Sequence, residues 1–343
     1  MIRSTVLGVL VGLALVAACG KKGGGGEGSG STGSNGSAGT AQPAGAKIKV
    51  AVSIFPLYDV TRRIAGDRAE VLLILPAGKS EHDYDPTPKE IAALDGAKLG
   101  VGVGLDMDNW ADNVLKSAGD PKVLKVGEKV KTMPIDVKPI EAEEGEHHDE
   151  HEHETGKGEG TAEHHEEHEH EHEVGAPDPH VWLDPERMIT IVQAIAAELT
   201  AADPAGKDTY AKNAETLIAS FKDLDAKITA RSKTWTKHTI VTFHGSMSYF
   251  ARKYGVRIGA VVEPIAGKEP TAAYIAEVVE AIKKNKAAAL FVEPQLDRAP
   301  GEMIAKEAKI ALGELDPVGG VAGRDSYEAL LTWNTDQLER VLK

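Results

Sequence analysis

The sequence of 343 residues contains a single cysteine, Cys19, so no intrachain disulfide can form and a folded body must be stabilised by its core. The apolar run from Val6 to Ala18 is too short to span a bilayer permanently. No basic patch suggests binding to nucleic acid. A secreted zinc hydrolase would need an open metal position and a general base, but the chain has no HExxH or other catalytic signature. We therefore predict that the protein is not an enzyme.

The N-terminus has the pattern of an exported protein. Arg3 precedes the apolar run, which ends in small residues directly before Cys19. This arrangement resembles a bacterial lipobox, in which the peptide is cleaved and the cysteine becomes the lipidated N-terminus. We predict a signal peptide over 1–18, then a lipidated Cys19 with a flexible Gly/Ser-rich tether over 19–46. The protein is expected to be anchored to a membrane through this lipid and to face the periplasm or the cell exterior. The alternative is an ordinary thiol within the signal peptide.

A tract of acidic residues and histidines occupies 141–173. Its fourteen glutamates and one aspartate against one lysine give it a net charge of −14, equal to that of the whole chain. Such a composition cannot form a core, and we predict a disordered insert. Imidazole and carboxylate groups together favour weak binding of divalent metal at several places. Nine of the thirteen histidines lie here, at His147, His148, His151, His153, His164, His165, His168, His170 and His172.

The rest of the chain predicts an α/β fold. Short β-like runs alternate with amphipathic helical stretches, as in open and mostly parallel sheets. Two such series, 47–204 and 235–343, flank a continuous helical pattern at 205–234. We predict an N-terminal α/β lobe carrying the insert, a long linker helix, and a C-terminal α/β lobe. Both lobes are expected to be doubly wound, with a cleft between them.

Four histidines lie outside the tract, and three are placed where ligands bind in such folds. His82 lies in a loop stiffened by prolines, His180 lies between Pro179 and Pro185, and His244 ends a predicted strand. Loops and strand ends of this kind converge on the cleft. Asp316 also ends a predicted strand and could complete a tetrahedral zinc site. Each histidine taken singly is also compatible with a hydrogen-bonded surface residue, and we assign His238 to that class.

Five ordered motifs carry a resemblance to a known family. GKSEHDYDPTPKEI, DPHVWLDP, TFHGSMSYFARKYGV, LFVEPQ and ELDPVGG resemble the metal-binding receptors of ABC importers for zinc and manganese, most of all the ZnuA-like zinc branch. The resemblance covers 47–343 and implies two lobes bridged by a rigid helix with a metal in the cleft. It places metal ligands at His82, His180 and His244, with Asp316 at the carboxylate position. Glu81 or a water is the alternative for the fourth ligand.

The resemblance also implies a function. We expect a monomeric receptor that captures Zn²⁺ and delivers it to the membrane permease of an ABC transporter. His244 stands where the manganese branch commonly has glutamate, which favours zinc, but a receptor for manganese (Mn²⁺) or iron remains an alternative. A metal-binding surface adhesin is another, because related receptors have been given that label. Trp182 and Tyr249 are interpreted as packing residues, and Glu293 as a carboxylate that supports the site or a hinge.

Overall fold

The computed structural model describes residues 47–135, 175–264 and 270–343. Contacts divide the chain into two units, Met1–Pro43 and Ala44–Lys343, and the first lies outside the described residues. The predicted signal peptide, Cys19, the tether and the tract at 141–173 also lie outside them. Within the described residues, no helix is both long and apolar enough to cross a membrane.

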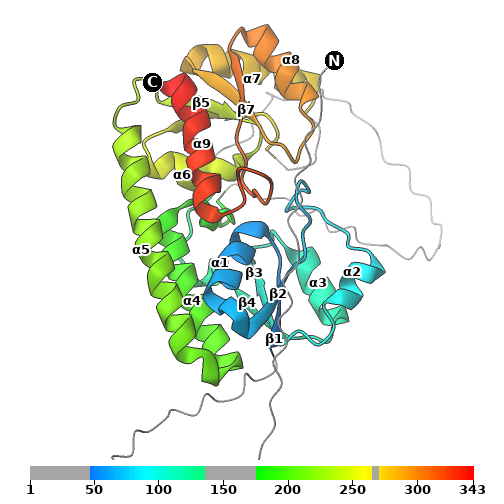
Figure 1. Ribbon diagram of the computed structural model, residues 1–343. Coiled ribbons are helices and arrows are strands. Elements are labelled where there is room, and N and C mark those ends of the chain that lie inside the picture. Colours follow the sequence, from blue (N-terminus) through cyan, green and yellow to red (C-terminus); the bar gives the residue numbers. More distant parts are fainter. Residues whose placement is uncertain (1–46, 136–174, 265–269) are drawn as a thin grey trace, which may run out of the picture. The chain divides into compact units, whose positions relative to one another are not determined.

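The first lobe is built on a four-stranded parallel sheet in the order β2-β1-β3-β4 (Figure 1). Its central strands β1 and β3 carry almost only apolar residues and glycine, as strands covered on both faces require. The strands are β1 (Ile48–Val52), β2 (Ala69–Leu73), β3 (Leu99–Gly102) and β4 (Lys122–Lys125). The helices are α1 (Phe55–Ala65), α2 (Pro88–Ala93) and α3 (Asn109–Ser117).

The second lobe repeats this design with a parallel sheet in the order β6-β5-β7-β8. Its strands are β5 (Thr239–Thr242), β6 (Arg257–Val261), β7 (Ala289–Val292) and β8 (Ala311–Glu314). Its helices are α6 (Ser248–Lys253), α7 (Ala272–Asn285), α8 (Ala299–Ala308) and α9 (Tyr327–Leu342). In both lobes the carboxyl ends of the strands lead into loops, which is where open α/β sheets bind ligands.

Two consecutive helices, α4 (Pro185–Ala202) and α5 (Lys207–Ser232), connect the lobes. The 26 residues of α5 reach ~39 Å at ~1.5 Å per residue, so this helix runs alongside both lobes (Figure 1). Its buried residues recur at helical spacing and include Tyr210, Leu217, Phe221, Leu224 and Ile228. The predicted architecture of two α/β lobes and a long helix is confirmed, while the exact domain boundaries remain predictions.

One hydrophobic core extends through both lobes. The same buried cluster contains Val50 and Val101 of the first sheet, Phe221 of α5, and Phe291 and Tyr327 of the second lobe. Because protein interiors are close-packed, a large opening of the lobes would expose much of this apolar surface. The fold therefore favours small relative movements of the lobes.

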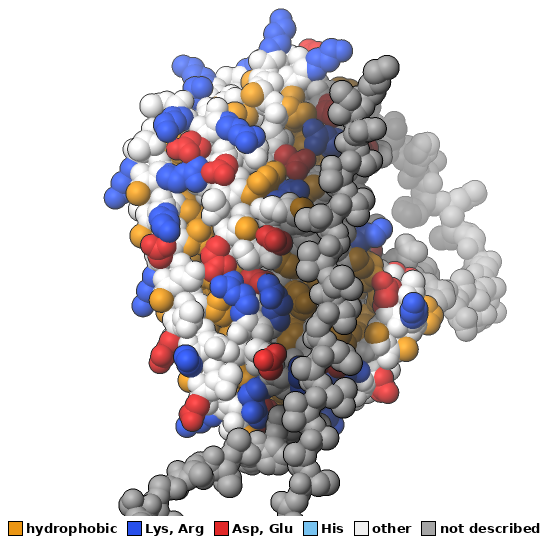
Figure 2. Space-filling model, viewed as in Figure 1, with side chains coloured by type: hydrophobic (Ala, Val, Ile, Leu, Met, Phe, Trp, Pro, Cys, Tyr) orange, Lys and Arg blue, Asp and Glu red, His pale blue; other side chains and the backbone are white. Residues whose placement is uncertain are grey.

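The surface carries charges of both signs. Figure 2 shows Lys and Arg interspersed with Asp and Glu over the face that it presents, without a large field of either sign. On this face the structure thus agrees with the balanced charge of the chain outside 141–173.

Candidate metal centre

Three histidines from separate parts of the chain meet at one place. His82 comes from the loop between β2 and α2, and His244 lies two residues after the end of β5 in the second lobe. His180 directly precedes a 3₁₀ turn, Val181–Leu183, that leads into α4. The site therefore joins the two lobes and the start of the helical connection.

The three rings are close enough to share one ion. One ring nitrogen of each histidine lies within 4.8 Å of those of the other two. The Nε2 atoms of His82 and His180 are 3.3 Å apart. Ring centroids are separated by 5.3 Å between His82 and His180, 4.8 Å between His82 and His244, and 5.3 Å between His180 and His244. Imidazole nitrogens converging in this way are a metal-binding arrangement.

Hydrogen bonds on the far side of two rings orient them toward the centre. Nδ1 of His180 lies 2.8 Å from Oδ1 of the buried Asp178, which also accepts the backbone N–H of His180 at 3.0 Å. Nδ1 of His244 lies 3.5 Å from the carbonyl oxygen of Glu263. If each Nδ1 carries the proton and donates it, Nε2 presents its lone pair to the centre.

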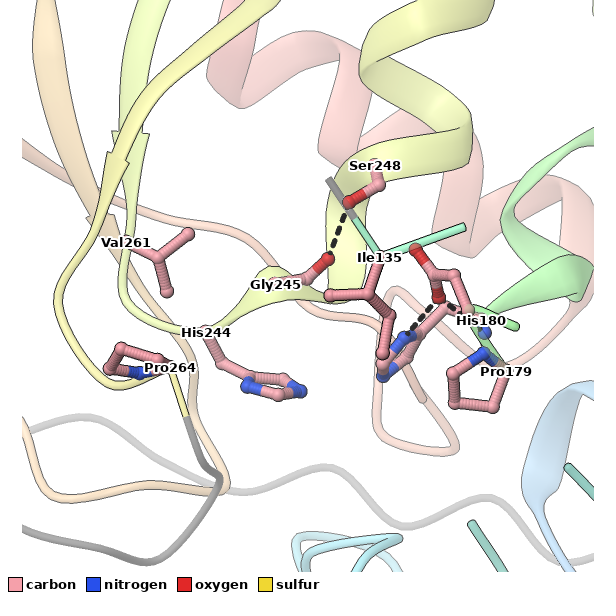
Figure 3. Close-up of a pocket in the computed structure, with 9 residues that line it drawn as sticks. Ile135, Pro179, His180, His244, Gly245, Ser248, Val261 and Pro264 are labelled. Carbon is pink, nitrogen blue, oxygen red and sulfur yellow. Dashed lines mark hydrogen bonds and ion pairs between the residues drawn. The ribbon is translucent and has the colours of Figure 1, made fainter. Parts of the chain in front are cut away.

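A small cavity of ≈ 30 Å³ adjoins His180 and His244. Figure 3 shows both rings beside it, and apolar Ile135, Val261 and Pro264 contribute to its lining. Only His82 of the three histidines is partly exposed, since His180 is 3% and His244 4% exposed. A cation bound here would be largely shielded from water, which strengthens its interactions with its ligands.

The loop that carries His82 is fastened to α3. The indole N–H of Trp110 donates to the backbone oxygen of Glu81 at 2.9 Å, and the ring of Tyr84 packs edge-on against Trp110. The hydroxyl oxygen of Ser80 accepts the N–H of His82 at 3.3 Å. These contacts hold His82 in place on a segment that has no regular secondary structure.

Four buried carboxylates lie in loops that follow strands of the two sheets, as His82 and His244 do, and they make this region suited to a cation. Glu81, Glu263, Glu293 and Asp316 are each at most 6% exposed. Burial raises the pKa of Glu81 to about 6, with His180 opposing the rise and Asp316 adding to it. Burial and then the neighbouring Glu81 raise the pKa of Glu293 well above its usual value. Clustered carboxylates that are costly to ionise would be stabilised by a bound metal ion.

Neither Asp316 nor Glu81 belongs to the group of converging ligand atoms, which contains the three histidines alone among the described residues. Oδ1 of Asp316 accepts hydrogen bonds from the side chain of Gln295 and from the backbone N–H groups of Val318 and Gly319 at 2.8 to 2.9 Å. Its Oδ2 lies 3.0 Å from a guanidinium nitrogen of Arg324. The two differ in hydrogen bonding, because Oε1 of Glu81 is buried without a hydrogen-bond partner among the described residues. The identity of the fourth ligand remains a prediction.

Other predicted residues have roles that their positions explain. Trp182 and Tyr249 are fully buried, as expected for packing residues, but they also tie the two lobes together. Trp182 donates to the carbonyl of Pro317 at 2.7 Å, and the hydroxyl of Tyr249 donates to the carbonyl of Asp178 at 2.8 Å. Glu293 accepts a hydrogen bond from Ser246, two residues after His244, at 2.5 Å.

The sequence interpretation missed two residues that contact predicted site residues, Asp178 beside His180 and Arg324 beside Asp316. Asp178 stands two positions before His180 in the motif DPH, a spacing that could have identified it. Arg324 had no such signal, because only the fold brings it to Asp316. His238, assigned to the surface, is exposed, and its Nδ1 lies 3.2 Å from the carbonyl oxygen of Gly255.

The chain is similar to known proteins over most of its length. A model of the family described as "ZnuA: Zinc-uptake complex component A periplasmic" matches residues 50–341. The chain is 30% identical over 286 residues to "Zinc-binding lipoprotein AdcA" of Streptococcus pneumoniae, covering 82% of this chain and 52% of AdcA. The chain thus spans about half the length of AdcA.

Two further similarities cover more of the partner chains. "Iron ABC transporter substrate-binding lipoprotein MtsA" of Streptococcus pyogenes is 28% identical over an alignment of 354 positions, gaps included, that covers 99% of this chain and 98% of MtsA. A solved structure titled "Crystal structure of ZnuA" matches with a TM-score of 0.70 and 22% identity. The match covers 87% of this chain and all of the solved chain, and it supports the fold alone.

Proposed function

This chain belongs to the family of the periplasmic zinc-uptake complex component A, and on that premise we propose that it captures Zn²⁺ outside the cytoplasmic membrane and delivers it to an ABC permease. The family is one of solute-binding receptors, which confirms the prediction that the chain is not an enzyme. The observation that carries the proposal is the convergence of three imidazoles at the meeting point of the two lobes.

The proposed ligands are Nε2 atoms of His82, His180 and His244. Neutral imidazoles suit zinc well, whereas manganese prefers oxygen donors and a higher coordination number. The fourth position would be filled by Glu81, by Asp316 or by a water. With Glu81 or Asp316 as the fourth ligand the site would be closed, and closed coordination favours binding over catalysis.

A receptor for manganese or iron is the second candidate. MtsA, named as an iron ABC transporter substrate-binding lipoprotein, supports this alternative. It is 28% identical to this chain, which is close to the 30% identity of AdcA. The carboxylates around the histidines are oxygen donors that such metals would use. The three imidazoles weigh in favour of zinc.

Release of the metal would follow from a small shift of the lobes. His82 and His244 belong to different lobes, so a relative displacement separates the proposed ligands from one another. The permease would drive the shift by binding one lobe arrangement more tightly than the other. Because one buried cluster extends through both lobes, a movement of about an ångström at the centre would cost less free energy than a wide opening.

Anchoring and the acidic tract complete the proposal. Both AdcA and MtsA are named as lipoproteins, which supports a lipid on Cys19 and a location at a membrane facing outward. The tract at 141–173 would bind zinc weakly near the cleft. It belongs to the segment between Ile135 and Gly175, and Ile135 lines the cavity beside His180.

Metal analysis of the purified protein tests the proposal. Wild type should bind one Zn²⁺ tightly and hold it against competition from Mn²⁺, and His180→Ala should lose that ion. His238→Ala is the matched control, since it removes an exposed histidine remote from the centre, and it should bind like wild type. Preference of the wild-type protein for Mn²⁺ over Zn²⁺ would favour the second candidate, and equal loss in both variants would refute the site.

A further inference from the structure

Arg324 is held beside Asp316 by the chain that follows β8. Its backbone closes a tight turn, in which Arg324 N–H donates to the carbonyl of Val321 and Gly320 N–H donates to that of Arg324, both at 2.9 Å. Its guanidinium lies 4.2 Å from the centre of the Trp333 ring of α9. The side chain is 15% exposed. A guanidinium held by stacking loses little freedom when it forms an ion pair.

This guanidinium forms an ion pair with Oδ2 of Asp316. Three hydrogen bonds already occupy Oδ1 of Asp316, whereas a guanidinium nitrogen of Arg324 lies 3.0 Å from Oδ2. The same nitrogen lies 3.3 Å from Glu314. Asn334 fixes the backbone of Asp316 through two hydrogen bonds, of 2.8 and 2.7 Å. Asp316 therefore cannot offer Oδ2 as a free ligand without weakening a buried ion pair.

Asp316 is nevertheless linked to the segment that carries His180. The indole N–H of Trp182, whose ring centre lies 5.3 Å from that of His180, donates at 2.7 Å to the carbonyl of Pro317, the residue after Asp316. The turn before Arg324 also contacts the first lobe, because a Cβ on Gly320, whose φ is +83°, would lie 3.0 Å from the ring of Phe55 in α1. A carboxylate released from Arg324 would thus be at hand for an ion held by the three histidines.

We propose that Arg324 is a specificity-determining residue for the metal: by holding Asp316 in an ion pair, it keeps this carboxylate from joining the three histidines. The centre then stays rich in nitrogen and low in coordination number, which suits zinc and not manganese. The inference rests on the proposed function, because it presumes that the histidines hold the ion. It assigns the fourth position to Glu81 or a water while Arg324 is in place.

The test compares the coordination of Co²⁺, used as a spectroscopic probe, in four proteins. These are wild type, Arg324→Met, Asp316→Asn, and the double variant. Methionine keeps an apolar stem beside Trp333 but removes the charge. Wild type should show the intense absorption of four-coordinate Co²⁺. Arg324→Met should show the weaker absorption of a higher coordination number, because Asp316 becomes a ligand.

Competition titration with Zn²⁺ and Mn²⁺ gives a second readout. Arg324→Met should shift the ratio of the two affinities toward Mn²⁺ by about tenfold, the equivalent of one charge-assisted hydrogen bond. The double variant should return to the wild-type ratio and spectrum, since it lacks the released carboxylate. Arg324→Lys retains the charge and should stay close to wild type.

Three outcomes would overturn the inference. Arg324→Met could leave both the spectrum and the ratio unchanged, or the double variant could behave like Arg324→Met. In the third, Asp316→Asn alone alters the Co²⁺ spectrum, which would show that Asp316 is already a ligand. This last measurement does not depend on the folding of any Arg324 variant. Failure of the wild-type protein to bind zinc would instead refute the proposed function.

Discussion

Asp178 offers the sharpest test of how the centre is organised. Its Oδ1 accepts two hydrogen bonds from His180, one from the backbone N–H at 3.0 Å and one at 2.8 Å from ring Nδ1 when that nitrogen is protonated. Both residues are at most 3% exposed, so water cannot replace the lost contacts. We expect Asp178→Ala to weaken the binding of zinc while leaving the three histidines in the chain.

The expected magnitude follows from the kind of bond. Hydrogen bonds to charged groups contribute about 1.5–3 kcal/mol, and removing a partner that orients a metal-binding histidine typically costs ~10–100-fold in affinity. Since a tenfold change corresponds to about 1.4 kcal/mol, the two estimates agree. Asp178→Asn retains an oxygen acceptor without the charge, so its affinity should fall by about tenfold. Asp178→Ala should approach ~100-fold.

Competition against a fluorescent zinc chelator would measure both affinities. The loop should stay in place in either variant, because Tyr249 bonds to the backbone carbonyl of Asp178 and not to its side chain. Asp85→Asn, which removes one exposed carboxylate near His82, controls for the change in net charge. The reasoning would be refuted if Asp178→Ala bound zinc as tightly as Asp85→Asn.

Three further predictions concern protons and the acidic tract. Zinc affinity should fall below about pH 6, because imidazoles with ordinary pKa values of ~6.5 must lose their protons to bind, and a constant affinity from about pH 5 to 8 would contradict a three-histidine centre. Burial alone would raise the pKa of Glu328, but hydrogen bonds from Arg63 and Ser220 outweigh it and lower that pKa. Their stabilisation is present above the unfolded-state pKa of ~4.3 and is lost as the pH falls through the lower folded-state value. Glu328→Gln should therefore cost about 1–3 kcal/mol at pH ~7 and little at pH ~3 in chemical unfolding, and an equal cost at both would contradict this. Deletion of 141–173 should remove weak zinc binding in equilibrium dialysis and keep one tight site, whose loss would show that the tract forms part of it.

Much of the fold could be read from the sequence because its elements are strongly patterned. The apolar run of β1 and the helical spacing of Tyr210, Leu217 and Phe221 in α5 are local signals that burial confirms. Periodicity over 26 residues leaves little ambiguity about a helix. That one of the buried clusters extends through both lobes was not predictable, since it depends on which apolar faces meet.

The candidate site divides in the same way. The sequence predicted His82, His180 and His244 as ligands from their placement in loops and at a strand end and from the motifs around them, and in the structure these three converge. It also paired these histidines with Asp316, which shares the strand-end position of His244. A sequence does not show which side chains contact one another. Neither the ion pair of Asp316 with Arg324 nor the hydrogen bond between Asp178 and the ring of His180 was therefore expected.

The sequence by itself determined the class of the fold, the kind of ligand and the absence of disulfides, because periodicity, imidazole chemistry and a cysteine count are properties of the chain alone. Only the tertiary structure decided which groups face one another. It brought three histidines spread over more than 160 positions within 4.8 Å, and it placed Arg324 against Asp316. Ligand geometry and the pairing of buried charges depend on distances between distant segments, and packing sets those distances.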